Sequence, residues 1–119
     1  MKAAEKKCFR LVQEIVCLRD RVCQRCCAMP ISGHHCFGRR NHSTAFEPDS
    51  CLALCPSCHD GWARKCPQGA RDLLGATIGE ERFTHLEFLS KQVVRLRPKD
   101  FSDIAAELGK RLERMRGKV

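Results

Sequence analysis

Two Cys-x-x-Cys pairs constrain this chain more than any other feature of its sequence. Cys23 and Cys26 form the first pair, and Cys55 and Cys58 form the second. Thiolates with two residues between them suit one edge of a tetrahedral zinc ion, and two such pairs supply a closed shell of four sulfur ligands. The spacing therefore predicts a structural Zn²⁺ that ties two distant segments of the chain together.

The length and the cysteine content limit the class of protein. With 119 residues, the chain is predicted to form a single domain, residues 1–119, short enough to gain stability from a metal cross-link. Its ten cysteines would also suit a secreted disulfide scaffold, but residues 1–7 lead into a charged helical pattern instead of an apolar signal peptide. No segment approaches the ~20 apolar residues needed to cross a bilayer. We therefore expect a cytoplasmic protein without a membrane partner.

The chain carries a strong excess of positive charge. Its net charge of +8 comes from 22 lysines and arginines against 14 acidic residues. A surface of this kind attracts polyanions such as DNA. An ordinary solvated basic surface would have the same composition, so charge alone favours neither interpretation.

Hydrophobic spacing divides the chain into an N-terminal helix over residues 1–21, a core over residues 22–66 and a helical tail over residues 67–119. In the core, prolines and glycines break the periodicity and leave room for short strands, loops and one brief helix from Pro56 to about Lys65. The predicted fold class is therefore α+β. The apolar positions of the first helix are Cys8, Leu11, Val12, Ile15 and Leu18.

Two amphipathic helices are predicted in the tail. Asp100, with Asp103 three residues later, resembles a capping box close behind Pro98 and would start the last helix. The apolar stripes suit either core packing or a homodimer through these C-terminal helices, and the sequence leaves both open. The first stripe comprises Phe83, Leu86, Leu89, Val93 and Leu96, and the second comprises Phe101, Ile104, Ala105, Leu108, Leu112 and Met115.

An insertion lies inside the cysteine framework. A zinc ribbon separates its two cysteine pairs by about 15–20 residues, whereas residues 27–54 intervene in this chain. The insertion contains Gly33-His34-His35, and His59 directly follows Cys58, the last cysteine of the two pairs. Because the cysteines complete a shell of four ligands, the histidines are free for other chemistry.

The order Cys-x-x-Cys, His-His, Leu-Cys-x-x-Cys-His over residues 22–66 resembles the HNH endonucleases of the ββα-metal class, in a zinc-stapled four-cysteine form. It is particularly similar to the phage recombination nucleases of the NinG type. The resemblance implies a ββα-metal core flanked by N- and C-terminal helices. It also implies a metal-dependent endonuclease that hydrolyses DNA phosphodiester bonds in phage DNA processing or recombination, in the cytosol of a bacterium or a phage-infected host.

The resemblance assigns roles to individual residues. His35 takes the part of the general base, while His34 and His59 hold one catalytic divalent ion. Matching by the Gly-His of the NinG type would make His34 the base instead, so their order stays open. Ser50, expected near a surface turn, precedes His59 by nine residues, where the family has an asparagine that orients the base or its loop. Ala63 stands where some relatives have a further histidine, which favours Mg²⁺ or Mn²⁺ held largely by water and phosphate.

These roles agree with general chemistry. An imidazole with a pKa near ~6.5 can accept a proton from water near neutral pH, and a divalent cation offsets charge on the scissile phosphate. Adjacent residues of a strand point to opposite faces, so His34 and His35 would need a twist or a bulge to face one ion. Asn41 is the next candidate for the motif's asparagine after Ser50, although it follows His35 closely.

Four basic residues, Arg39, Arg40, Arg64 and Lys65, flank the predicted site and are candidates for DNA phosphate binding, although each could equally be ordinary surface charge. The alternative function is a catalytically silent zinc-stapled DNA-binding module, which the departures at positions 50 and 63 make credible. A redox protein is disfavoured because no βαβ pattern surrounds the Cys-x-x-Cys pairs. Four other cysteines are expected to be small buried residues instead of a second metal site. They are Cys27, Cys36, Cys51 and Cys66.

Overall fold

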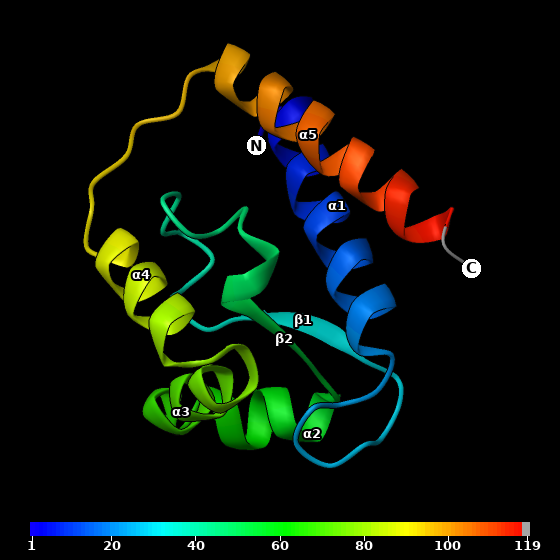
Figure 1. Ribbon diagram of the computed structural model, residues 1–119, viewed down its shortest axis with the longest axis vertical. Helices are drawn as coiled ribbons and strands as arrows, with labels where there is room; N and C mark the ends of the chain where they lie inside the picture. Colours follow the sequence, from blue (N-terminus) through cyan, green and yellow to red (C-terminus); the bar gives the residue numbers. More distant parts are fainter. Residues whose placement is uncertain (118–119) are drawn as a thin grey trace.

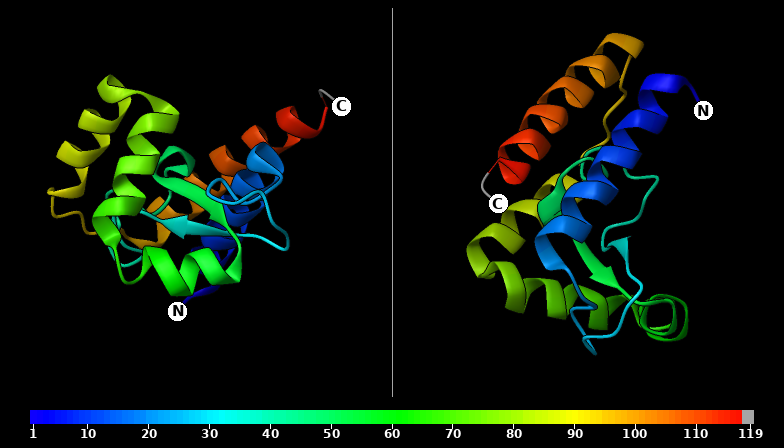
Figure 2. Two further views of the ribbon diagram at one scale, coloured as in Figure 1. Left: turned by 90° about the horizontal axis from the view of Figure 1, so that it is seen from below. Right: turned by 90° about the vertical axis from the view of Figure 1, so that its right-hand side faces the viewer.

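A small sheet lies between two pairs of helices in the computed structural model, which describes residues 1–117 and has an α+β fold. Helices α1 and α5 lie on one side of the sheet, and α3 and α4 lie on the other (Figures 1 and 2). No helix within residues 1–117 is long and apolar enough to cross a membrane. The elements in chain order are α1 (Ala3–Asp20), β1 (Ser32–His35), the 3-10 turn η1 (Pro48–Ser50), β2 (Cys51–Leu54), α2 (Pro56–Cys58), the π-helical turn η2 (His59–Ala63), α3 (Pro67–Ile78), α4 (Glu80–Ser90) and α5 (Pro98–Arg116).

The two strands are antiparallel, with Gly33 opposite Ala53 and His35 opposite Cys51. Every residue of β2 is buried, because both faces of the strand are covered. Cys51 and Ala53 pack into the cluster formed with α1 and α5, whereas Leu52 faces the cluster formed with α3 and α4. Successive residues of a strand point to opposite faces, and both faces of β2 are covered, which explains why β2 is apolar at every position.

Helix α1 and the segment after it cover both outer edges of this sheet. The side-chain amide of Gln13 accepts the backbone N–H of Gly33 at 2.7 Å and donates to its carbonyl at 2.9 Å. On the other edge, the Asp20 carboxylate accepts the N–H of Ala53 at 2.9 Å, and the backbone N–H of Gln24 donates to the Ala53 carbonyl at 2.9 Å. Two side chains and one backbone N–H therefore satisfy backbone groups that a two-stranded sheet would otherwise leave unpaired.

The predicted N-terminal helix is confirmed, and its apolar face packs against α5. The predicted capping box at the start of α5 lies one turn too far along the chain. The Asp100 carboxylate accepts the backbone N–H of Arg97 at 2.8 Å, so the capping box pairs Arg97 with Asp100 and Asp103 plays no part in it. The reason is that Pro98 already occupies the first helical position.

The prediction for the tail before α5 is wrong in two respects. Helix α3 was not predicted, and the expected helix through Val93 and Leu96 ends earlier, at Ser90. Val93 is 94% exposed in the connection to α5. The side-chain amide of Asn41 donates to the carbonyl of Ser90 and so satisfies the end of α4.

The apolar stripe of α5 is largely used inside the chain. Phe101, Ala105, Leu108 and Leu112 are buried in the cluster that includes α1. A homodimer through the C-terminal helices stays a prediction, and it would have to use other faces of α4 and α5. Phe88, which is 61% exposed on α4, is one apolar side chain available for such a contact.

Candidate metal centre and histidine groove

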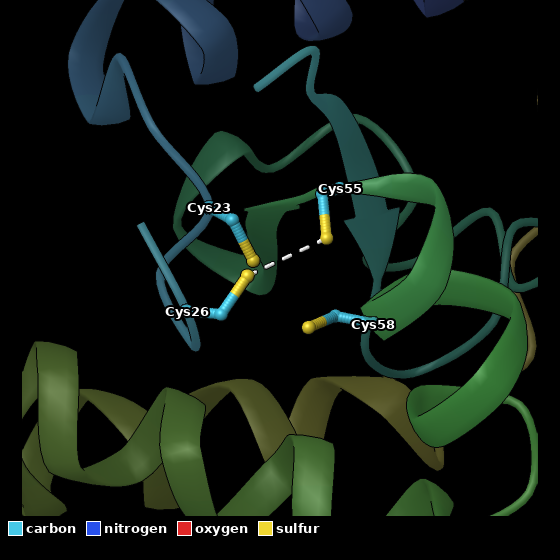
Figure 3. Close-up of side chains that lie close together, drawn as sticks. All are labelled: Cys23, Cys26, Cys55 and Cys58. Atoms are coloured by element: carbon cyan, nitrogen blue, oxygen red, sulfur yellow. Dashed lines mark hydrogen bonds between the residues drawn. The ribbon is translucent and has the colours of Figure 1, made fainter. Parts of the chain in front are cut away.

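The four cysteines of the two Cys-x-x-Cys pairs converge as predicted. Their sulfur atoms all lie within 4.8 Å of one another and, as Figure 3 shows, turn toward a common centre. The Sγ atoms of Cys26 and Cys55 are 3.6 Å apart. A tetrahedral zinc ion with Zn–S bonds of about 2.3 Å requires sulfur atoms roughly 3.8 Å apart. The donor set and its dimensions therefore fit a structural metal ion such as zinc.

The surroundings of the cluster favour the thiolate, the form that binds metal, at Cys23 but not at Cys26. A backbone hydrogen bond from Ala28 lowers the pKa of Cys26, but the neighbouring sulfur atoms of Cys55, Cys23 and Cys58 outweigh it and raise this pKa to about 12. Burial alone would raise the pKa of Cys23, but hydrogen bonds from the backbone of Cys55, Cys26 and Arg25 lower it to about 6. The Arg25 guanidinium lies 3.7 Å from the Cys58 sulfur and stacks over the Trp62 ring at 4.3 Å. A fixed cation at this place offsets negative charge on a shell of four thiolates.

The other cysteines form no second cluster within residues 1–117. Cys36 and Cys51 are buried, as expected, and burial raises the pKa of each to about 12. The expectation of burial is wrong for Cys27 and Cys66, which are exposed. Cys27 has a left-handed backbone, with φ of 67°, in the tight turn that follows Cys26.

A groove of about 850 Å³ lies beside the sheet and contains all three motif histidines. His34 and His35 come from the end of β1, and His59 comes from the start of η2. The remaining wall is formed by one face of α1 and by the loop after β1. The full lining is Met1, Lys6, Phe9, Arg10, Gln13, Ser32, Gly33, His34, His35, Gly38, Arg39, His59 and Arg64.

His34 and His59 form a pair within this groove. Their ring centroids are 5.0 Å apart, in an edge-to-face arrangement. Burial, followed by the nearby His59 and His35, lowers the pKa of His34 to about 4, so its imidazole is neutral at neutral pH. The Nδ1 atom of His59 lies 3.1 Å from an Asp60 carboxylate oxygen. Because a carboxylate only accepts, Nδ1 carries the hydrogen in this arrangement and Nε2 is free to bind a cation.

His35 has different partners. Its Nε2 atom lies 3.1 Å from the Ala45 carbonyl oxygen, and its ring meets Phe9 edge-on at 5.9 Å. Since a carbonyl oxygen only accepts, Nε2 carries the hydrogen and Nδ1 keeps its lone pair. Burial lowers the pKa of His35, the bond to Ala45 opposes this shift, and the charge of Arg39 adds to it. The two histidines of the strand thus both reach the groove, but with separate neighbours.

Ser50 supports the loop that carries Ala45. Its side-chain oxygen lies 2.7 Å from the carbonyl oxygens of both Thr44 and Glu47. The expectation that Ser50 lies near the surface is wrong, because the residue is 1% exposed beneath this loop. Asn41 holds the same loop from its other end, where its backbone carbonyl accepts the N–H groups of Thr44 and Ala45.

The predicted helix from Pro56 to Lys65 is interrupted by the π-helical turn. The backbone N–H of Arg64 donates to the His59 carbonyl at 3.1 Å, five residues back instead of four. Ala63 is consequently buried in the cluster beside the cysteines, and Arg64 reaches the groove. In a regular α-helix, Ala63, four positions after His59, would instead lie on the same face as His59.

The predicted basic residues divide into two groups. Arg39 and Arg64 line the groove, and the Arg39 guanidinium is held over the Phe9 ring at 4.3 Å. Arg40 and Lys65 are exposed but do not line it. Sequence reasoning missed the groove residues of α1, which look like the solvated face of an amphipathic helix. It also missed Asp60, whose position directly after His59 was the available signal.

Comparisons with known proteins identify no relative of this chain. No protein-family model, curated protein or solved structure matches this chain.

Proposed function

We propose that this protein is a metal-dependent endonuclease that hydrolyses phosphodiester bonds of DNA. One observation carries the proposal. His34, His35 and His59 share a groove whose charged lining, among the described residues, is entirely basic. A phosphodiester needs such a combination, because its anionic backbone must be bound while a proton is taken from water. By the resemblance drawn from the sequence, the activity would serve phage DNA processing or recombination.

His35 is the proposed general base. A base must be neutral at the working pH, and the lowered pKa of His35 favours this form. Its Nε2–H is directed at the Ala45 carbonyl, which leaves the Nδ1 lone pair to accept a proton from water. Ser50 acts as a positioning residue in this scheme, since its hydroxyl holds the loop that presents Ala45.

His34 and His59 are the proposed ligands of a catalytic divalent ion. Both rings line the groove, and Asp60 orients His59 so that Nε2 is available. A bound Mg²⁺ or Mn²⁺ would offset charge on the scissile phosphate and on the leaving oxygen. Imidazole suits transition metals better than Mg²⁺, so we expect cleavage to be faster with Mn²⁺.

The cysteine cluster is the proposed site of a structural Zn²⁺. The ion would join the turn after α1 to helix α2 and the residue before it, and His59 directly follows this helix. It would therefore hold one of the two catalytic metal ligands in place from a distance. A closed shell of four thiolates leaves no open position for substrate, so the cluster itself is not a catalytic site.

The alternative is a catalytically silent, zinc-stapled DNA-binding module. Two observations favour it. Ser50 occupies the position expected for asparagine, and Ala63 is buried, so only two histidines remain as ligands for a catalytic ion. The same basic groove would then bind DNA without cutting it.

Incubation of the purified protein with supercoiled plasmid and with branched DNA distinguishes the two functions. Each substrate is tested with Mg²⁺, with Mn²⁺ and with EDTA. Nicking or linearisation that requires a divalent ion supports the nuclease. DNA binding without cleavage under every metal condition supports the silent module and overturns the nuclease.

A further inference from the structure

One wall of the histidine groove is a single face of helix α1. Lys6, Phe9, Arg10 and Gln13 all line the groove, and their spacing of three or four residues places them on one side of the helix. Phe9 and Gln13 are occupied inside the protein, beneath Arg39 and against Gly33. Lys6 and Arg10 line the groove and are exposed to solvent.

The charges of this face are available to a ligand. Within residues 1–117, Lys6 takes part in no ion pair, and Arg10 pairs only with Glu14, at 2.9 Å. That pair is weak because the Arg10 side chain is 58% exposed, and Glu14 also has a second partner, Arg116, at 3.1 Å. No acidic residue lines the described part of the groove and competes for the two cations.

The spacing of the two cations suits the backbone of a nucleic acid. Residues one helical turn apart are separated by about 6 Å along the helix axis. Phosphates of one strand of B-DNA advance by about 3.4 Å per nucleotide along the duplex axis. Lys6 and Arg10 can therefore contact phosphates that are one or two nucleotides apart, while Arg39 and Arg64 approach the groove from two other segments.

We infer that the Lys6–Arg10 face of α1 binds the phosphates of the DNA strand that flank the scissile phosphate. This inference rests on the proposed function, because it takes the groove to be a DNA site. It adds a contact surface from outside the cysteine and histidine motif. The contacts are to the sugar-phosphate backbone, so they hold the strand without reading its sequence.

The test measures DNA binding in a background that cannot cleave. Binding of a short labelled duplex to His35→Ala protein is followed by fluorescence anisotropy over a range of salt concentrations. The groove variant carries Lys6→Gln and Arg10→Gln. Each phosphate contact contributes about 0.9 to the slope of log affinity against log salt, so losing two should lower the slope by about 1.8.

A matched control removes the same two charges at the same helical spacing. Lys110 and Arg114 lie four residues apart on α5, are exposed, and are outside the histidine groove. Lys110→Gln with Arg114→Gln should leave the slope within error of the parent. The exchange Lys6→Arg with Arg10→Lys keeps both charges and should also keep the slope.

Equal slopes for the groove variant and the control variant would overturn the inference, as would a parent protein that does not bind DNA. Failure of the nuclease proposal gives a different result. In that case the unmodified protein cleaves no DNA with any metal, yet the groove variant still lowers the salt slope. The two failures are therefore distinguishable.

Discussion

Replacement of Gln13 by leucine should show how much its two hydrogen bonds to β1 contribute to stability, apart from the packing of helix α1. The amide of Gln13 binds both backbone groups of Gly33, at 2.7 and 2.9 Å, directly before the two histidines of β1. The contact is close because residue 33 is glycine: a Cβ atom added at this position would lie only 3.1 Å from the Gln13 amide nitrogen. Leucine has a similar volume but no hydrogen-bonding group, so Gln13→Leu leaves the N–H and the carbonyl of Gly33 without partners.

The expected loss of stability follows from these two backbone groups. Leaving one buried polar group unpaired costs about 1–3 kcal/mol. Gln13 borders the groove, from which water can reach part of the site, so we take the lower half of the range and expect a loss of about 2–4 kcal/mol. For a domain of this size, each kcal/mol lowers the melting temperature by roughly 4 °C, which gives a fall of roughly 8–16 °C.

Thermal and urea unfolding, followed by circular dichroism, measure this effect. Gln68→Leu is the matched control, because the Gln68 amide binds only the exposed Asp72 side chain, and its loss should cost less than about 0.5 kcal/mol. Gln13→Glu keeps an acceptor for the Gly33 N–H and should fall between the parent and Gln13→Leu. Equal stability of Gln13→Leu and Gln68→Leu would refute the proposed role of the two hydrogen bonds.

Four further perturbations test other parts of the site. Burial lowers the pKa of His35 below 6.5, the ordinary value for histidine, so its neutral form persists to lower pH. If His35 is the general base, the cleavage rate at saturating Mn²⁺ should fall only below pH 6.5. A rate that already falls above pH 6.5 would contradict this role for His35. Cys55→Ser should lose the zinc found by metal analysis, and much of the domain should unfold. Cys66→Ser, which changes an exposed cysteine outside the cluster, should keep its zinc and stay folded. A parent protein that is folded without zinc would contradict this prediction. Ser50→Ala should lower kcat and cost about 0.5–1.5 kcal/mol, since the hydroxyl no longer holds the Thr44 carbonyl, and a parental kcat would reduce Ser50 to a turn residue. Ser50→Asn should cost about 1–3 kcal/mol because it inserts a larger side chain at a position that is only 1% exposed.

Local spacing was sufficient to predict the parts of the molecule that are determined by neighbouring residues. The four cysteines converge because each Cys-x-x-Cys pair forms within one turn, and only the joining of the two pairs requires the fold. Helix α1 follows from an apolar stripe that is continuous from Cys8 to Ile15. Short strands were expected between the two cysteine pairs, and the structure has two there, β1 and β2; their antiparallel pairing was not predicted.

Features that depend on distant contacts were not predictable in this way. Gln13 is a polar residue on a helix, and its role appears only when Gly33 is brought beside it. Val93 and Leu96 continue a helical pattern, yet α4 ends at Ser90, where the amide of Asn41 satisfies its last carbonyl. These outcomes are decided by tertiary hydrogen bonds, which local propensity does not encode.

The π-helical turn is a third feature of this kind. Its sequence is compatible with a regular α-helix, in which Ala63 would share the face of His59. The longer turn instead places Ala63 in the buried cluster beside the cysteines and brings Arg64 to the groove. One of the four basic residues of the groove therefore depends on this turn, which directly follows the cysteine cluster.

The rate of plasmid cleavage by His35→Ala protein tests the proposed nuclease most directly. A general base contributes about 10²–10⁴-fold to the rate, so at saturating Mn²⁺ this variant should cleave slower than the parent by a factor in that range. Added imidazole should restore part of the rate, and His85→Ala, which changes an exposed histidine outside the groove, should cleave as fast as the parent. Undiminished cleavage by His35→Ala would contradict the account, because the residue that it names as the base would then take no part in the reaction.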